Sequence, residues 1–220
     1  MDIIASKKLI NSADSVVSQS VEGFLMMNPN MKRLGKLNVL VRADIDVTKN
    51  QYVSILTGGG AGHEPAHAGY IGPGMISCAV LGNVFASPSV ASILSGIRAV
   101  AGSTGVLLVV KNYTGDRLNF GMAAELAKQE GIAVETIIVA DDVALPIGKG
   151  ITGGRGIAGT VFVHKVAGAA AAKGLSLSDV HAAAMDATSR IGSMGVALTT
   201  CTVPGSSVCR DRGVYECMSL

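Results

Sequence analysis

Residues 52–69 read YVSILTGGGAGHEPAHAG, so a strand-forming run leads directly into glycines and two histidines. The β-branched and aromatic residues at 52–56 predict a buried strand. Glycine-rich loops leave backbone N–H groups open to an anion or a polyol, although glycines also serve tight turns between a strand and a helix. Because ligands of open α/β sheets bind where the strands end, we expect a small polar ligand at this loop.

The composition restricts the possible classes of protein. With 220 residues, 49% of them hydrophobic, the chain can bury one sizeable core and the start of a second. A net charge of +2 provides no basic field, which argues against a nucleic-acid partner. Polar residues or glycines interrupt every apolar run that could span a membrane, and Lys7 and Lys8 follow the first apolar residues, the reverse of a secretory signal. We therefore expect a cytosolic protein with no membrane partner, and four cysteines without CxxC spacing indicate reduced thiols.

Strand-like and helix-like periodicities alternate along the chain, which predicts an α/β fold. The apolar run 106–110 suits a strand covered on both sides, as in a parallel or mixed sheet with helices on both faces. Ser87 with Pro88 and Ser176 with Asp179 are typical of helix starts. Strands are expected at 39–41, 52–56, 106–110, 134–139 and 196–199, and helices at 6–25, 90–100, 118–129, 160–173 and 176–191.

These elements predict a division of the chain into three parts. We expect a first α/β domain over residues 1–175 and the beginning of a second, incomplete α/β domain over 176–206. Residues 207–220 have neither helical nor strand periodicity, so we expect a divergent and poorly ordered tail there.

Polar residues gather again after the strand expected at 106–110. Lys111 and Asp116 follow it and precede a predicted helix. If this strand neighbours 52–56, both side chains approach the glycine loop; alternatively, Asp116 only caps the helix. A third cluster, Asp141-Asp142 with the glycine-rich 148–159, is more typical of turns than of catalysis.

Residues 63–67 match the HExxH pattern of zinc metalloproteases, in which a helix presents two histidines to one metal ion. Here the pattern follows glycines and contains Pro65, both of which disfavour a long helix. The remaining histidines, His164 and His181, fall in predicted helices, where we expect surface or hydrogen-bonded roles. We therefore assign no metal ligand.

Four longer motifs together resemble the dihydroxyacetone kinase family. They are GGGAGHEPAHAGYIGPGM at 58–75, FASPS at 85–89, VVKNYTGDRLNFG at 109–121 and CTVPGS at 201–206. The resemblance covers about the first 206 residues. It is to the triose-binding, N-terminal region of the family, in the form found in animal-type triokinase/FMN cyclases.

The resemblance implies a site for dihydroxyacetone or glyceraldehyde. His63 and Asp116 would be catalytic, because their family counterparts hydrogen-bond the substrate hydroxyls and help to move the proton during phosphate transfer. A positioned imidazole or carboxylate can accept the proton of an alcohol. Ala61 stands where the family often has serine, which removes a hydroxyl and leaves the backbone donor. The full set of substrate-binding residues implied is Gly60, Ala61, Gly62, His63, Lys111 and Asp116.

The resemblance also implies parts that residues 1–220 do not contain. Family members continue past the CTVPGS segment to a GIHGE-type motif, whose histidine bonds covalently to the ketone carbon, and to a helical domain that binds ATP and magnesium. This chain is therefore expected to bind no cofactor itself, to represent a truncated triose kinase that is nearly inactive alone, and to form a homodimer. The alternative is a non-catalytic regulatory module that pairs with full-length kinase subunits.

Overall fold

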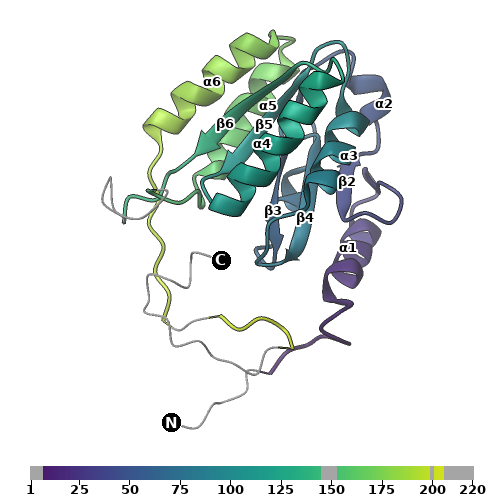
Figure 1. The fold of residues 1–220 in the computed structure, drawn as a ribbon, viewed down its shortest axis with the longest axis vertical. Helices are drawn as coiled ribbons and strands as arrows, with labels where there is room; N and C mark the ends of the chain where they lie inside the picture. Colours follow the sequence, from purple (N-terminus) through teal and green to yellow (C-terminus); the bar gives the residue numbers. More distant parts are fainter. Residues whose placement is uncertain (1–6, 145–152, 199–200, 206–220) are drawn as a thin grey trace.

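The computed structural model describes residues 7–144, 153–198 and 201–205, which form a six-stranded mixed sheet with helices on both faces (Figure 1). The strand order is β1-β2-β4-β3-β5-β6. Strands β3 to β6 run parallel, and β1 and β2 extend the sheet as antiparallel strands. The predicted α/β class is confirmed. The strands are β1 Met31–Arg33, β2 Val39–Arg42, β3 Ser54–Ala61, β4 Cys78–Val84, β5 Val106–Lys111 and β6 Val134–Val139.

Strand β3 lies between β4 and β5, and the direction in which the chain adds strands to the sheet reverses at β3. The chain runs from β3 to β4 on one side and returns through a helix to β5 on the other. Thr57 is in register with Val109, whose carbonyl oxygen accepts a 2.7 Å hydrogen bond from the Thr57 hydroxyl. A reversal of this kind opens a crevice at the carboxyl ends of the two strands, where open α/β sheets bind their ligands.

Two apolar layers hold the helices against the sheet. Alternate residues of a strand point to opposite faces, so Ile55 and Leu107 lie in the layer under α5 and α6, whereas Leu56 and Leu108 lie in the layer under α3 and α4. Figure 1 shows the two pairs of helices on either side of the strands. The helices are α1 Val16–Met27, α2 Ile45–Thr48, α3 Val90–Val100, α4 Thr114–Gln129, α5 Thr160–Ala172 and α6 Leu177–Arg190, with a 3₁₀ turn η1 at Ala68–Tyr70.

Several predicted boundaries are wrong. The cap of α3 is Ser89 rather than Ser87, since the Ser89 hydroxyl accepts a 3.2 Å hydrogen bond from the Ser92 N–H. Helix α1 begins at Val16 instead of Ser6, and strand β4 was not predicted. No strand forms at 196–198, the described part of the strand expected at 196–199.

Helix α6 belongs to the layers of the first sheet. Val180, Ala184 and Ala187 are buried in the same apolar layer as β3 and α5, so the first core continues beyond the boundary that we expected at residue 175. The second α/β domain expected over residues 176–206 otherwise stays a prediction, and the predicted tail at 207–220 lies outside the described residues. Among the described residues, none of the helices has the length and apolar character needed to cross a membrane.

Candidate functional site

The glycine run forms the end of β3 rather than a loop beyond it. Gly58, Gly59 and Gly60 continue the strand as far as Ala61, which corrects the predicted loop. A Cβ at Gly58 would lie 2.3 Å from the Val80 carbonyl oxygen, and one at Gly60 would lie 2.6 Å from the Ala86 nitrogen. The close approach of β4 and of the segment after it therefore requires glycine at these positions.

Lys111 and Asp116 reach this glycine strand from its neighbour. Lys111 is the last residue of β5, and Asp116 lies in the first turn of α4. A Cβ at Gly59 would be 3.0 Å from Lys111 Nζ and 3.7 Å from Asp116 Oδ2, so the missing side chain makes room for both groups. Asp116 does not cap the helix, because the N-cap residue is Tyr113 and no side-chain cap forms.

The surroundings of Lys111 and Asp116 shift the pKa values of both groups. Burial raises the pKa of Asp116, and this effect is opposed by a hydrogen bond from Ser87 and by the charge of Lys111. Burial lowers the pKa of Lys111, opposed by the Asp116 carboxylate. Asp116 Oδ1 has no hydrogen-bond partner among the described residues. Because an unpaired buried polar atom is costly, the site suits a ligand that hydrogen-bonds to this carboxyl group.

His63 lies at the mouth of the site, where its ring is 5.0 Å from that of Phe85. Its pKa is lowered, first by burial of the ring and then by the charge of Lys111, with Glu64 opposing. Phe85 has a φ of +55°, a left-handed conformation that bulky residues rarely adopt. This conformation places the Phe85 ring where a Cβ at Gly62 would be 2.8 Å away. A neutral His63 beside this ring has a nitrogen available to accept a proton.

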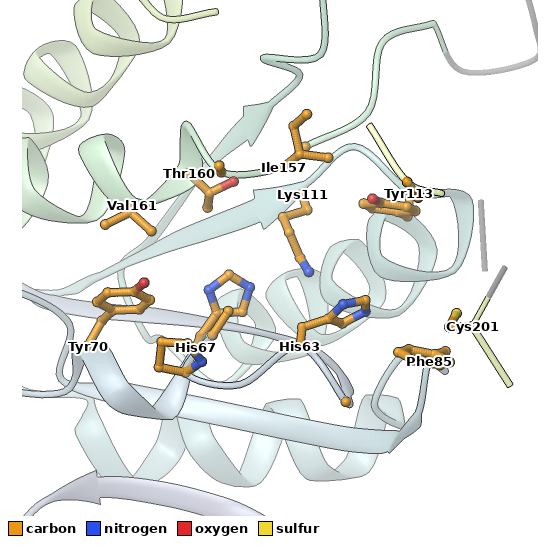
Figure 2. A pocket seen from close by; sticks show the side chains of 16 residues that line it. His63, His67, Tyr70, Phe85, Lys111, Tyr113, Ile157, Thr160, Val161 and Cys201 are labelled. Atoms are coloured by element: carbon orange, nitrogen blue, oxygen red, sulfur yellow. The ribbon is translucent and has the colours of Figure 1, made fainter. Parts of the chain in front are cut away.

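Two adjoining cavities open at this edge of the sheet. The larger, of about 520 Å³, extends past His67 to Thr160 and Val161 at the start of α5. Figure 2 shows Lys111 reaching into the space between His63 and His67. Polar groups gather in the smaller cavity, of about 20 Å³, which is lined by Gly60, His63, Phe85, Ser87, Lys111, Tyr113 and Asp116.

The two histidines of the HExxH pattern have different surroundings. His67 is buried, and its Nδ1 lies 3.1 Å from Nε2 of His164. Burial lowers the pKa of His164 to about 3 and that of His67 well below its usual value, so both rings are neutral at pH 7. Residues 63–67 form no helix, and the part of the chain that is described contains no group of three metal-ligating side chains. The arrangement required by the zinc pattern is not formed.

Asp141 holds the backbone of the segment that contributes Ile157 to the larger cavity. Its carboxylate accepts hydrogen bonds of 2.8 and 2.7 Å from the N–H groups of Ile157 and Gly159, which is the turn role expected for it. Lys111 Nζ lies 5.5 Å and Arg155 Cζ lies 5.7 Å from the centre of the Tyr113 ring. Burial raises the pKa of Tyr113 to about 12, so its phenol stays protonated at pH 7. Residues 148–152 of the predicted third cluster lie outside the described residues.

The structure brings most of the predicted site residues together. Gly60, His63, Lys111 and Asp116 line the smaller cavity, and Gly62 lines the larger one. Ala61 lines neither, and it is buried at the end of β3.

Sequence reasoning did not include in the predicted site five other residues that line the cavities. Two of them follow β4, and the apolar run 78–81 between glycines was the signal for that strand. The other three depend on contacts between distant segments, for which the local sequence carries no signal. The five are His67, Phe85, Ser87, Tyr113 and Thr160.

Comparison with known proteins identifies the family. The Dak1 domain model matches residues 22–212. A Solanum lycopersicum protein with the provisional name 3,4-dihydroxy-2-butanone kinase is 57% identical over 210 residues, which are 94% of this chain and 35% of that protein. The human triokinase/FMN cyclase is 48% identical over 205 residues, 92% of this chain and 35% of the human protein. The dihydroxyacetone-binding subunit DhaK of a Listeria innocua kinase is 48% identical over 199 residues, 90% of this chain and 60% of that subunit.

Solved structures with the same fold include an enzyme and a regulator. The dihydroxyacetone kinase of C. freundii superposes with a TM-score of 0.87 at 46% identity, over 93% of this chain and 38% of the kinase. The dihydroxyacetone kinase operon co-activator Dha-DhaQ superposes with a TM-score of 0.72 at 34% identity, over 76% of this chain and 51% of the co-activator. The chain spans about a third of the length of the tomato and human relatives. With most of its residues matched by the family model, the chain belongs to the Dak1 domain family.

Proposed function

We propose that this chain is the substrate-binding portion of a kinase that phosphorylates dihydroxyacetone or glyceraldehyde with ATP. The observation that carries the proposal is the convergence of Lys111, Asp116 and His63 on the bare backbone of Gly60, around one small polar cavity. Relatives named as dihydroxyacetone kinases and as a dihydroxyacetone-binding subunit support it.

The polar groups of the smaller cavity match an uncharged triose. A triose carries hydroxyl groups and one carbonyl group on three carbons. Asp116, which is 4% exposed, accepts a hydrogen bond from a hydroxyl, and Lys111 donates one to an oxygen. A charged carboxylate is an acceptor only, so the site favours ligands that donate hydrogen bonds. The site therefore distinguishes a polyhydroxylated ligand from an apolar one of the same size.

The same groups prepare a hydroxyl for phosphorylation. An alcohol is a weak nucleophile, and an acceptor within hydrogen-bond reach of the hydroxyl takes its proton as phosphate is transferred. Asp116 is suited to this role because burial raises its pKa, and His63 because its lowered pKa leaves the ring neutral at pH 7. In this proposal the residues of this chain bind and orient the triose and take the proton. ATP and magnesium are bound by a separate helical domain.

Calorimetric titration of the chain with dihydroxyacetone tests the binding step. We expect saturable binding that glyceraldehyde and glycerol compete for, since both carry hydroxyls for Asp116. A coupled assay with Mg-ATP tests the kinase step, and we expect little phosphorylation by residues 1–220 alone. The absence of dihydroxyacetone binding at millimolar concentrations would contradict the proposal. So would phosphorylation at an ordinary rate by this chain alone, because it would require an ATP site here.

A second candidate function is regulatory. The structural similarity to the Dha-DhaQ co-activator shows that this fold is also found in a protein named for regulation. In this case the chain would bind a triose and pair with full-length kinase subunits in the cytosol. This pairing would resemble the homodimer that is expected for the chain itself. Co-purification with a full-length relative, together with a change in its kcat, supports the regulatory function. Unchanged kinetics of that relative in the presence of this chain would exclude it.

A further inference from the structure

Phe85 has an unusual backbone conformation for a residue outside the core. Its φ of +55° lies in the left-handed region, which costs free energy for a residue with a bulky side chain. The side chain is half-buried and belongs to neither of the two apolar layers formed by the described residues, so core packing does not offset this cost. Strained residues of this kind gather at active sites, where the surrounding structure holds them in place. The conformation of Phe85 therefore points to a role in the site.

The end of β3 determines where Phe85 lies. The Phe85 N–H donates a 2.9 Å hydrogen bond to the Ala61 carbonyl oxygen. A Cβ at Gly60 would lie 2.8 Å from the Phe85 Cα, and a Cβ at Gly62 would lie 2.8 Å from Cε1 of the Phe85 ring. The two glycines therefore leave room for Phe85 to pack closely against this segment.

The ring held in this way packs against the imidazole of His63. The two ring centres are 5.0 Å apart and the ring planes are inclined by 51°, a geometry in which aromatic rings attract each other. Figure 2 shows the Phe85 ring on one side of His63 and the Lys111 nitrogen on the other. His63 lies outside the helices and strands, and its ring forms no hydrogen bond with the described part of the chain. Packing against Phe85 is therefore a main restraint on the orientation of this imidazole.

Phe85 also separates His63 from solvent. It lines the small polar cavity and the larger one, as His63 does. Burial is the largest of the influences that lower the pKa of His63. The charged and titratable groups that face the imidazole are Lys111, which lowers its pKa further, Glu64, which raises it, and the buried, neutral His67. Removal of the Phe85 ring changes the burial of His63 and leaves these three groups in place.

We propose that Phe85 is a positioning residue for His63: its ring, held by a left-handed backbone just after β4, keeps the imidazole in one orientation beside the small polar cavity. The inference rests on the proposed binding of a triose in this cavity. A fixed imidazole loses less rotational freedom when it forms a hydrogen bond to a triose hydroxyl. It also presents a nitrogen to that hydroxyl in the geometry that proton transfer requires.

Substitutions that suit the left-handed backbone isolate the role of the ring. Asparagine and glycine both adopt positive φ readily, so Phe85→Asn and Phe85→Gly remove the ring without imposing a new backbone conformation. The matched control is Phe162→Ala, because Phe162 is 65% exposed on α5 and lines neither cavity. The urea midpoints of both Phe85 variants should stay near that of the parent chain, since relief of backbone strain offsets the lost contacts of the ring.

Two measurements on the full chain report the effect on His63. The first is the titration of its Hε1 signal in ¹H–¹³C spectra, assigned by the loss of that signal in His63→Gln. We expect the midpoint to rise towards the ordinary value of 6.5 in both Phe85 variants, because water then reaches the imidazole, and to be unchanged in the control. The second is calorimetry with dihydroxyacetone. Its Kd should rise roughly two- to tenfold in the Phe85 variants, as expected when one neutral hydrogen bond is weakened.

An unchanged His63 midpoint or an unchanged Kd in both Phe85 variants would overturn the inference. So would a large fall in both urea midpoints, because the ring would then serve the fold rather than His63. If the parent chain bound dihydroxyacetone and the variants bound it equally well, the role of Phe85 would be refuted and the triose site would stand. If the parent chain itself did not bind dihydroxyacetone, the proposed function would fail together with this inference.

Discussion

The exchange Asp116→Asn separates the binding role of this carboxyl group from its effect on stability. Asparagine has nearly the same shape and carries no charge. Asp116 is 4% exposed, and its Oδ1 has no partner among the described residues. We expect the variant to bind dihydroxyacetone more weakly and to fold at least as stably as the parent chain.

The size of the binding effect follows from the hydrogen bond that is weakened. A hydrogen bond to a charged group contributes about 1.5–3 kcal/mol. Since about 1.4 kcal/mol corresponds to a factor of ten, the Kd for dihydroxyacetone should rise by roughly tenfold to a hundredfold.

The effect on stability has the opposite sign. Burial raises the folded-state pKa of Asp116 above its ordinary value of 3.8. The folded chain therefore holds this proton more tightly than the unfolded chain does. As a result, the free energy of unfolding falls as the pH rises from about 3.8 through the folded-state pKa. Above that pKa the whole penalty is present, and Asp116→Asn removes it.

Calorimetry with dihydroxyacetone and urea unfolding at pH 8 measure the two quantities on the same samples. Asp186→Asn is the matched control, because Asp186 is exposed and pairs with Arg190 on the same helix. This control should change neither the Kd nor the stability appreciably. The reasoning would be refuted if Asp116→Asn bound dihydroxyacetone as tightly as the parent chain, or if it were much less stable than the control.

Three further predictions concern the scaffold. Gly58→Ala should lower the free energy of unfolding by about 1–3 kcal/mol, because the new Cβ would overlap the Val80 carbonyl oxygen; a urea midpoint equal to that of the parent would contradict this. Ser89→Ala should lower the free energy of unfolding by about 1 kcal/mol, because the α3 cap is lost. In the same urea unfolding experiment, Ser87→Ala should show no such loss, because Ser87 is not the cap. Because His164 has a lowered folded-state pKa of about 3, the unfolded chain takes up its proton first, and stability should fall as the pH drops from about 6.5 towards 3. His164→Gln should make this fall shallower in pH-dependent unfolding curves, and an unchanged slope would exclude His164 as its cause.

Elements set by local sequence could be predicted well. Strand β6 occupies the expected residues 134–139, and Ser176 caps α6 as its spacing with Asp179 indicates. Both depend on periodicity or on capping within a few residues.

Features set by distant packing could not be predicted. The glycines extend β3 because β4 approaches its backbone too closely for side chains, and β4 itself was missed. Ser87 was expected to cap α3, but its side chain instead acts on Asp116, where it opposes the rise in the pKa of that carboxyl group. His164 lies 97 residues from its partner His67, so an alanine-rich helix alone gave no reason to place that pair beside the cavity.

The location of the bound triose tests the central claim most directly. In ¹H–¹⁵N correlation spectra of the labelled chain titrated with dihydroxyacetone, the largest shift changes should occur at the amides of 58–63 and 111–116. These two segments meet where β3 and β5 end. Saturable changes confined to them would agree with a triose held between His63, Lys111 and Asp116. Changes centred on the opposite edge of the sheet, around Arg42 and Ser77, would contradict the site proposed here.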